Sequence, residues 1–396
     1  MEEREIYAAA VEIVRRNRGK LEVKAKVGAA NREELSVVYT PGVAEPTRRV
    51  RDDHALQFQY TNRSTNLAIV TDGSAVLGLG NIGPEAAMVV MEGKGVMLKE
   101  FAGADPVPLC LSTQDTETII ATVKAIEPSF GFIFLEDISA PRCFEIVDRL
   151  SRELSIPVFH DDQEGTAVAL CAAIKNMLRL TGDRLGDKRI VVNGAGAAGL
   201  ATAKLIREMG GHDIVLCDKV GVLTGSTPGL DPYRAAFAAQ TDSRGATTLT
   251  EALRGADILI GLSVARVVTQ DMVRGMRPGA AAFCLANPDP EILPPDAKAA
   301  GARFTASGRF DYPNTINNLH AFPGIVRGTM EAGARQVTLG MKLAAVDAIA
   351  GYVPDAALAD DFLMPEALDP ALALHVADRV AAAARSEGVA RGGKDA

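Results

Sequence analysis

The sequence predicts an α/β fold of two domains, each with a mostly parallel sheet covered by helices. Apolar strands and helical segments alternate from about residue 66 onwards, which is typical of βαβ units. A glycine-rich turn at 194–199 separates a strand from an alanine-rich helix. The length of 396 residues, 47% of them hydrophobic, suits two domains that each bury a core.

The first half of the chain alternates between strand and helix signals. Residues 3–16 have the apolar spacing of a helix. Residues 37–39 look like a short strand, which the turn at Pro41 and Gly42 ends. The other expected elements are a strand at 66–73 (NLAIVTDG), a glycine-rich loop that becomes a helix near Pro84, a strand at 107–112 (VPLCLS), a helix from near Asp115, a strand at 131–137 (GFIFLED), a helix from near Pro141 and a strand at 156–160 (IPVFH).

The second half repeats the alternation with sharper signals. Residues 188–210 (KRIVVNGAGAAGLATAKLIREMG) indicate a strand, a glycine turn and a helix. Further strands are expected at 213–219 (DIVLCDK), 256–263 (ADILIGLS) and 281–288 (AAFCLANP). We predict that the domains join at 160–187, through a helix that begins after Asp162. The predicted domains are therefore 1–160 and 161–396, and the second ends in helices.

Composition argues against several classes of partner. The formal net charge is −8, so the chain lacks the basic surface that nucleic acid requires. No apolar run reaches the roughly 18 residues of a membrane span, and the acidic N-terminus does not resemble a signal peptide. The five widely spaced cysteines match neither a disulfide framework nor a zinc motif. We therefore expect a cytoplasmic protein with a small-molecule substrate.

The turn at 194–199 predicts a dinucleotide site in a Rossmann-type domain, since it fits G-x-G-x-x-G between a strand and a helix. Asp218 ends the next strand, where a carboxylate would bind the ribose hydroxyls. This carboxylate favours NAD because it would repel a 2′-phosphate, but Lys219 beside it leaves NADP open. The alternative is a tight turn without a ligand. The loop residues expected at the cofactor are Gly194, Ala195, Gly196, Ala197, Ala198 and Gly199.

Two acidic pairs follow two predicted strands: Glu136 with Asp137, and Asp161 with Asp162. Because the carboxyl ends of parallel strands share one edge of a sheet, the four groups should lie together. They would repel one another unless a cation holds them. All-oxygen ligation suits Mg²⁺ or Mn²⁺. The alternative is that Asp137 and Asp162 cap the helices that follow.

Lys94 and Tyr39 are further candidates for chemistry. Lys94 lies near the helix that follows the glycine-rich loop. A neighbouring metal ion and nicotinamide ring would lower its pKa into the range of a base. Taken alone, a helical lysine is more often a surface residue, and Tyr39, just before a turn, is more often a packed aromatic.

Several segments together resemble the malic enzymes, in their short bacterial form. They occur in that family's order, from residue 35 to about 328. The segments are SVVYTPGVAEP, DGSAVLGLGNIGPEAAMVVMEGKGVMLKEFAG, FLEDISAP, FHDDQEGTA, VVNGAGAAG, LANPDPEI and SGRFDYPNTINNLHAFPGIVRG. The resemblance implies oxidative decarboxylation of (S)-malate to pyruvate and CO₂ with NAD(P)⁺ and Mg²⁺ or Mn²⁺.

The resemblance also implies roles for individual residues. Tyr39 resembles the family's general acid and Lys94 its general base, which Asp161 would support. The other matches are Glu136, Asp137 and Asp162 to the metal ligands, Asn287 and Asn318 to the substrate-binding asparagines, with Asn287 also expected near the cofactor, and Gly194, Gly196, Gly199 and Asp218 to the dinucleotide fingerprint.

Two positions depart from the family pattern. Ala75 stands where larger eukaryotic relatives have an arginine for the substrate carboxylate, so Lys99 or a partner-subunit residue would have to supply that charge. Glu164, in HDDQEGTA, stands where bacterial relatives usually have histidine. It could alter local pKa values or contact a neighbouring subunit.

Other functions are compatible with parts of the pattern. A malolactic or oxaloacetate-decarboxylating enzyme on the same scaffold would keep every motif. A dinucleotide-binding regulator without catalysis would not need Tyr39, Lys94 and the metal ligands together. The resemblance further implies a homo-oligomer, with a dimer favoured.

Overall fold

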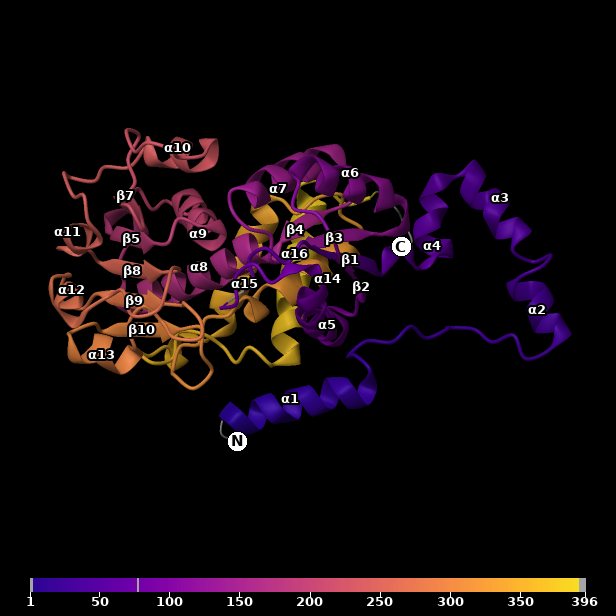
Figure 1. Cartoon of the computed structure of the whole chain (residues 1–396), viewed down its shortest axis with the longest axis horizontal. Coiled ribbons are helices and arrows are strands. Elements are labelled where there is room, and N and C mark those ends of the chain that lie inside the picture. Colours follow the sequence, from indigo (N-terminus) through magenta and orange to yellow (C-terminus); the bar gives the residue numbers. More distant parts are fainter. Residues whose placement is uncertain (1–2, 77, 392–396) are drawn as a thin grey trace.

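The computed structural model of the chain describes residues 3–76 and 78–391. Two sheets lie side by side, and helix α8 (Asp161–Thr181) lies between them (Figure 1). None of the helices in the described residues combines the length and apolar character that a membrane span requires. The predicted α/β fold, with an N-terminal α/β part followed by a Rossmann-type sheet, is confirmed.

The first sheet is four-stranded and parallel, in the order β2-β1-β3-β4. Its strands are β1 (Asn66–Thr71), β2 (Asp105–Cys110), β3 (Phe132–Leu135) and β4 (Val158–His160). Helices α5 (Gly83–Ala102), α6 (Thr116–Ile126) and α7 (Arg142–Glu153) connect them. Strand β3 is buried along its whole length, as expected for a parallel sheet covered on both faces. The strands predicted in this half beyond residue 65 are confirmed.

Local sequence explains where these helices begin and end. Pro84 lies in the first turn of α5, where its missing N–H costs no hydrogen bond. The same helix ends at Gly103, whose φ of +68° is left-handed. Asp115 caps α6 by accepting a hydrogen bond from Thr118 N at 2.8 Å. Each helix therefore returns the chain to the start of a neighbouring strand.

The second sheet has six strands in the order β10-β9-β8-β5-β6-β7, of which β7 is antiparallel. Its strands are β5 (Arg189–Asn193), β6 (Asp213–Asp218), β7 (Gly221–Val222), β8 (Ile258–Gly261), β9 (Ala281–Cys284) and β10 (Phe304–Ser307). The connecting helices are α9 (Ala197–Glu208), α10 (Pro232–Ala238), α11 (Leu249–Leu253), α12 (Gln270–Arg274) and α13 (Pro294–Ala299). The order matches that of dinucleotide-binding sheets, with chain reversal between β5 and β8.

Three C-terminal helices return to the first sheet. They are α14 (Phe322–Glu331), α15 (Leu339–Tyr352) and α16 (Pro370–Ser386). Helices α14 and α16 pack on each other and both contact α5, while α15 packs against α8. Figure 1 shows these helices, coloured from orange to yellow, beside β1–β4. The division of the chain at residues 160 and 161 stays a prediction.

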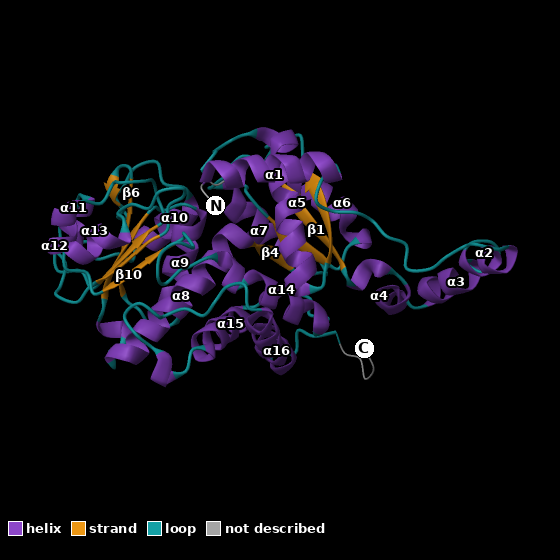
Figure 2. Cartoon of the chain, turned by 90° about the horizontal axis from the view of Figure 1, so that it is seen from below, coloured by secondary structure: helices purple, strands orange, loops and turns teal. Residues whose placement is uncertain are grey.

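An N-terminal arm projects from this body. It contains α2 (Arg32–Val38) and α3 (Ala44–Asp52), which Figures 1 and 2 show well away from both sheets, beyond α1 (Glu3–Asn17) along the chain. Neither α2 nor α3 has a buried residue. The strand predicted at 37–39 is wrong, because Val37 and Val38 end α2. Asn31 caps that helix by accepting a hydrogen bond from Glu34 N at 2.9 Å, which outweighs the strand preference of the valines.

Candidate active site

Three carboxylates gather at the carboxyl ends of β3 and β4. Glu136 directly follows β3, and Asp162 is the second residue of α8, which begins directly after β4. Asp137 has a positive φ of 56°, uncommon for a residue with a side chain, and its N–H donates to Asp162 Oδ2 at 2.8 Å. One oxygen of each carboxylate lies within 4.8 Å of the others. The structure thus brings these three predicted residues together.

Helix capping does not account for these carboxylates. The N-cap of α7 is Pro141 and that of α8 is His160, and neither forms a side-chain cap. Asp162 lies within the first turn of α8, and Asp137 lies before Pro141 in the loop. The capping alternative is therefore wrong for both residues.

The cluster contains buried oxygens without partners. Glu136 Oε2 and Asp137 Oδ2 have no hydrogen-bond partner among the described residues. Burial raises the pKa of Glu136 well above its ordinary value, although Lys94 opposes this shift. Burial and Asp162 raise the pKa of Asp137 to about 7. A hard divalent cation would neutralise these oxygens, and the donor set fits Mg²⁺ or Mn²⁺.

Lys94 extends from α5 into the same cluster. Its Nζ lies 2.6 Å from Asp161 Oδ2 and 3.0 Å from Glu136 Oε1, and its side chain is only 12% exposed. Nζ also lies 4.5 Å from the centre of the Phe322 ring. Burial disfavours the charge on Lys94, but Asp161 and Glu136 outweigh burial and raise its pKa above the ordinary value. The sequence predicts a lowered pKa for Lys94, but the pKa is raised in this structure because two carboxylates are the nearest charges to Nζ.

Asp161 connects two candidate groups. Its Oδ2 accepts hydrogen bonds from Lys94 Nζ and from Asn318 Nδ2, both at 2.6 Å. Burial raises the pKa of Asp161 to about 6, against the effect of Lys94. Gly165 makes this arrangement possible, because a Cβ there would overlap Asp161 Oδ1. Lys94, Asp161 and Asn318, distant in sequence, thus form one hydrogen-bonded group.

His160 and Glu164 form no hydrogen bond with this group. His160 is fully buried, and neither ring nitrogen has a hydrogen-bond partner among the described residues, although Nδ1 lies 3.7 Å from Asp162 Oδ2. Burial lowers the pKa of His160, which favours the neutral ring. Glu164 forms an ion pair with Lys342 of α15, and the two side chains are 14% and 22% exposed. Glu164 therefore ties α8 to α15 within one chain. This role accounts for a departure that the sequence alone did not explain.

Arg142 is a residue of this region that the sequence interpretation missed. It is the first residue of α7, and its Nη2 donates to Asp72 Oδ2 at 2.8 Å and to Ser74 Oγ at 2.9 Å. Ala75 N donates to Asp137 O at 2.9 Å, so the guanidinium bonded to the neighbouring Ser74 lies beside the loop that carries Asp137. The available signal was a basic residue at a helix start directly after the acidic strand end.

Lys99, the cation suggested in place of the eukaryotic arginine, lies elsewhere. Its Nζ donates to Asp105 Oδ1 at 2.6 Å, and Asp105 begins β2. That position is at the amino end of the parallel strands, opposite the carboxylate cluster. Of the two cations Lys99 and Arg142, Arg142 is the one that the structure places beside Ala75, because it hydrogen-bonds to the neighbouring Ser74.

The glycine-rich turn has the geometry of a dinucleotide loop. Gly194 has a φ of +114°, which a residue with a side chain rarely adopts. A Cβ on Gly199 would overlap Gly194 O, so this glycine allows the helix to pack on the strand. Gly196 is exposed, is the N-cap of α9, and would have open space around a Cβ. That space lies at a helix N-terminus, where a diphosphate binds.

Asp218 and Asn287 lie at or beyond the carboxyl ends of strands in the second sheet. Asp218 is the last residue of β6, which pairs with β5 before the turn. Its Oδ2 lies 3.5 Å from Arg234 Nη1, and its Oδ1 accepts from Val220 N at 2.8 Å. Asn287 follows β9, and its backbone oxygen would lie 3.5 Å from a Cβ on Gly78, in the loop before α5. Asn287 therefore lies where the two sheets' loops meet.

Tyr39 is a predicted catalytic residue that the structure does not bring to this site. It follows α2 on the arm and is 68% exposed. Figures 1 and 2 show α2 far from α5 and α8, which carry Lys94 and Asp161. Within a single chain, the predicted base and the predicted acid are therefore separated.

Two family models match this chain. Residues 18–151 match the malic enzyme N-terminal domain, and residues 163–385 match the malic enzyme NAD-binding domain. A bifunctional malic/malolactic enzyme from Bacillus subtilis is 47% identical over 95% of this chain and 92% of its own length. An NAD-dependent malic enzyme from Geobacillus stearothermophilus is 44% identical over 94% of this chain and 78% of its own.

Solved structures agree with the sequence relatives. The NAD-dependent malic enzyme from Thermotoga maritima superposes with a TM-score of 0.90 at 44% identity, over 94% of this chain and 98% of that one. The malic enzyme from Pyrococcus horikoshii also reaches 0.90, at 43% identity, over 95% of this chain and 89% of that one. The resemblance seen in the sequence motifs is confirmed, and the chain belongs to the malic enzyme family.

Proposed function

We propose that this chain catalyses the metal-dependent oxidative decarboxylation of (S)-malate to pyruvate and CO₂, with reduction of NAD(P)⁺. The observation that carries the proposal is the group of Lys94, Asp161 and Asn318 beside the carboxylate cluster. A regulator without catalysis would have no use for a buried lysine held between two carboxylates.

Glu136, Asp137 and Asp162 would hold Mg²⁺ or Mn²⁺. When bound, such an ion supplies a Lewis acid for the negative oxygen that develops as CO₂ leaves. It would also engage the buried oxygens of Glu136 and Asp137 that otherwise lack partners. With the charge of Glu136 thus committed, less negative charge would hold the proton on Lys94, which can then act as a base.

The chain's own groups then carry the proton transfers. Neutral Lys94 Nζ accepts the proton of the 2-hydroxyl while the C2 hydride passes to the nicotinamide, which gives a β-keto acid. The bond from C3 to the departing carboxylate breaks and CO₂ leaves. The electron pair of that bond stays on the substrate and forms the enolate. A proton from the Tyr39 hydroxyl at C3 completes pyruvate. Asn318, fixed by Asp161, would orient the substrate.

The Tyr39 step requires the arm of a second copy. Apolar side chains on the arm are exposed without a partner in the described chain: Leu35 is 48% exposed, Val37 70% and Tyr39 68%. Burial of this surface would stabilise an assembly, since each fully buried large apolar side chain contributes roughly 1.5–3 kcal/mol. The site of a second copy would contain the base, Lys94, but would lack the acid, Tyr39. We therefore propose a homodimer in which each arm delivers Tyr39 to the partner.

The cofactor preference follows from Asp218. Its carboxylate would accept hydrogen bonds from the ribose hydroxyls and repel a 2′-phosphate. Arg234, whose Nη1 lies 3.5 Å from Asp218 Oδ2, and the adjacent Lys219 reduce that repulsion. We infer a preference for NAD⁺ and a cytoplasmic location, the latter because the free cysteines suit a reducing compartment.

Turnover with both cofactors tests the function. Purified enzyme with malate and Mn²⁺ should raise absorbance at 340 nm, with kcat/KM for NAD⁺ about tenfold or more above that for NADP⁺. Asp218→Ser should narrow this ratio, because it removes the repulsion. Lactate formation without net NADH would instead favour malolactic activity, the second candidate, which the Bacillus subtilis relative supports. No turnover of malate to either product would contradict both.

Asp162→Ala should weaken the dependence on metal rather than cofactor binding. The concentration of Mn²⁺ for half-maximal rate should rise by at least about tenfold, since even residues around metal ligands change affinity by that factor. Asp148→Ala is the matched control, because Asp148 is an exposed carboxylate on α7 paired with Arg152. Equal Mn²⁺ titration curves for Asp162→Ala and wild type would remove Asp162 from the metal site.

A further inference from the structure

A cavity of about 760 Å³ lies at the other end of the first sheet from the carboxylates. Its wall includes Ser64, two residues before β1, and Gly131 and Pro157, which directly precede β3 and β4. Glu136 and Asp162, by contrast, follow β3 and β4. The cavity is therefore separate from the active site, and it lies on the first sheet rather than at the glycine-rich turn of the second.

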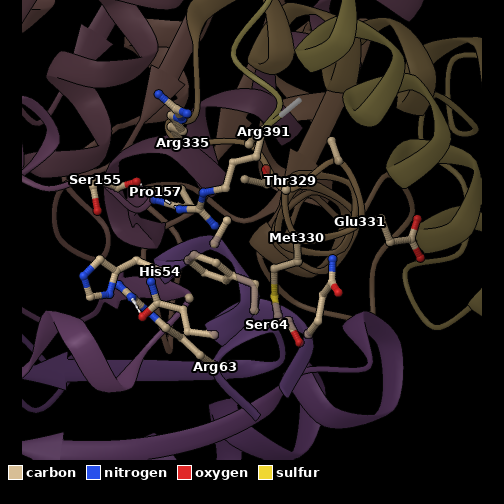
Figure 3. Close-up of a pocket in the computed structure, with 18 residues that line it drawn as sticks. His54, Arg63, Ser64, Ser155, Pro157, Thr329, Met330, Glu331, Arg335 and Arg391 are labelled. Atoms are coloured by element: carbon tan, nitrogen blue, oxygen red, sulfur yellow. Dashed lines mark hydrogen bonds between the residues drawn. The ribbon is translucent and has the colours of Figure 1, made fainter. Parts of the chain in front are cut away.

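Three arginines line this cavity: Arg63, Arg335 and Arg391. Figure 3 shows the Arg391 side chain between Arg335 on one side and Arg63 with His54 on the other. The apolar part of the wall includes Met330. The cavity thus combines several cations with an apolar surface, which is the usual make-up of a site for a small organic anion.

The hydrogen bonds of the Arg63 and Arg391 side chains go to neutral oxygens of the described chain rather than to carboxylates. Arg63 donates only to neutral oxygens, from Nε to Phe130 O at 2.8 Å and from Nη2 to Glu127 O at 3.2 Å. Arg391 Nη2 donates to Ser155 O at 3.0 Å. Among the residues that the structure describes, neither of them nor Arg335 forms an ion pair.

Glu331, an acidic residue of the wall, is already engaged. Its Oε1 accepts a hydrogen bond from Arg327 Nε at 2.7 Å. Glu127 lies nearby, but its Oε1 is taken by Ser155 N at 2.9 Å and Ser155 Oγ at 2.5 Å. Among the described residues that line the cavity, three arginines therefore face one glutamate, and their net charge is positive.

Two of the three guanidinium groups, those of Arg63 and Arg391, are also held in place. The Phe58 ring lies 3.8 Å from Arg391 Cζ and 4.8 Å from Arg63 Cζ, so both cations stack on one aromatic side chain. Burial, together with Arg63 and Arg335, lowers the pKa of Arg391 to about 10. Arg63 is buried and Arg391 is partly buried, whereas Arg335 lies at the exposed side of the cavity. Cations that repel one another in this way are stabilised by an anion between them.

We propose that this cavity is a binding site for a small organic anion, recognised through a carboxylate or phosphate group by Arg335 and Arg391. Guanidinium groups pair with both kinds of oxyanion, and the volume admits a metabolite rather than an inorganic ion alone. Because the cavity lies at the opposite end of the strands from Lys94, the ligand would be an effector. Helix α14 links the two places, with Phe322 against Lys94 and Met330 in the cavity wall.

Calorimetric titration of the full-length protein tests the site. Phenyl phosphate and phenylacetate serve as the phosphate and carboxylate probes, at constant ionic strength and with NAD⁺ at saturation so that the glycine-rich turn is occupied. We expect one saturable site per chain for at least one probe. Arg335→Ala/Arg391→Ala should weaken binding by about tenfold or more, because two charge-assisted contacts are lost. Arg391→Lys, which keeps the charge, should have an intermediate affinity.

The matched control is Arg274→Ala/Arg277→Ala, which removes two exposed arginines beside the second sheet and should leave binding unchanged. The probe that binds more tightly identifies the head group. No saturable heat with either probe, or equal affinity in the cavity double variant, overturns the site. A saturating probe should also change the KM for malate in wild type but not in the double variant. An unchanged KM in wild type overturns the effector role.

Discussion

Replacing Lys94 with alanine is expected to lower kcat for malate oxidation by about 10³-fold while dinucleotide binding stays nearly unchanged. Lys94 is the only cation in hydrogen-bond contact with Asp161 among the described residues, and the described contacts of the glycine-rich turn do not involve it. Loss of the amine removes the proton acceptor for the 2-hydroxyl. The measurement is NADH formation at 340 nm, with NAD⁺ binding followed separately by calorimetry.

Lys94→Arg is the informative companion variant. A guanidinium keeps the positive charge between Asp161 and Glu136, so it preserves the electrostatic balance of the cluster, but it does not lose its proton at neutral pH. Both variants should therefore be inactive, while the arginine variant should keep a melting temperature closer to that of wild type. Near-normal turnover by either variant would show that another group is the base.

The separate steps of the reaction distinguish base from acid. Exchange of tritium into C3 of pyruvate reports protonation of the enol and does not require oxidation of the 2-hydroxyl. Tyr39→Phe should slow this exchange more than it slows hydride transfer, because the phenol acts after CO₂ has left. Equal losses in both reactions would assign Tyr39 to positioning rather than to proton donation.

Much of the site could be predicted because parallel strands impose it. Glu136 and Asp162 follow β3 and β4, which are neighbours in a parallel sheet, so their side chains share one edge whatever the loops do. The glycine-rich turn is equally constrained, since only glycine tolerates the φ of Gly194 and the packing at Gly199. These predictions depend on local rules that the rest of the fold does not change.

The features that were not predicted depend on long-range contacts. Glu164 finds Lys342 across 178 positions of sequence, and no local pattern around Glu164 indicates that partner. The pKa of Lys94 rises rather than falls because Asp161 and Glu136 lie at 2.6 and 3.0 Å. For Glu164 and Lys94 the effect follows from distance, which a sequence does not contain. The helix at Val37 and Val38 is a different case, because its cap is local: Asn31 accepts from Glu34 N three residues along the chain, which strand propensity alone does not register.

Mixing two variants that are each impaired in pyruvate formation is expected to restore part of this activity if Tyr39 acts on the partner's site. In a dimer of one Lys94→Ala chain and one Tyr39→Phe chain, exchanged arms pair the intact Lys94 of one chain with the intact Tyr39 of the other. One of the two sites is then complete. Random association at equal concentrations should give about a quarter of the wild-type activity, because about half of the dimers are mixed.

The same mixture stays inactive if Tyr39 folds back onto its own chain, because each site then carries one substitution. Lys94→Ala mixed with Asp162→Ala is the matched control, since both residues belong to the same body and no arrangement of arms rebuilds a complete site. Co-expression with two different tags isolates the mixed dimer, and mass photometry checks its composition. Activity in the mixture of Lys94→Ala with Tyr39→Phe, but not in the control mixture, would explain why the apolar residues of the arm are exposed in a single chain. The surface on which they pack, and the site in which Tyr39 acts, would both belong to the other copy.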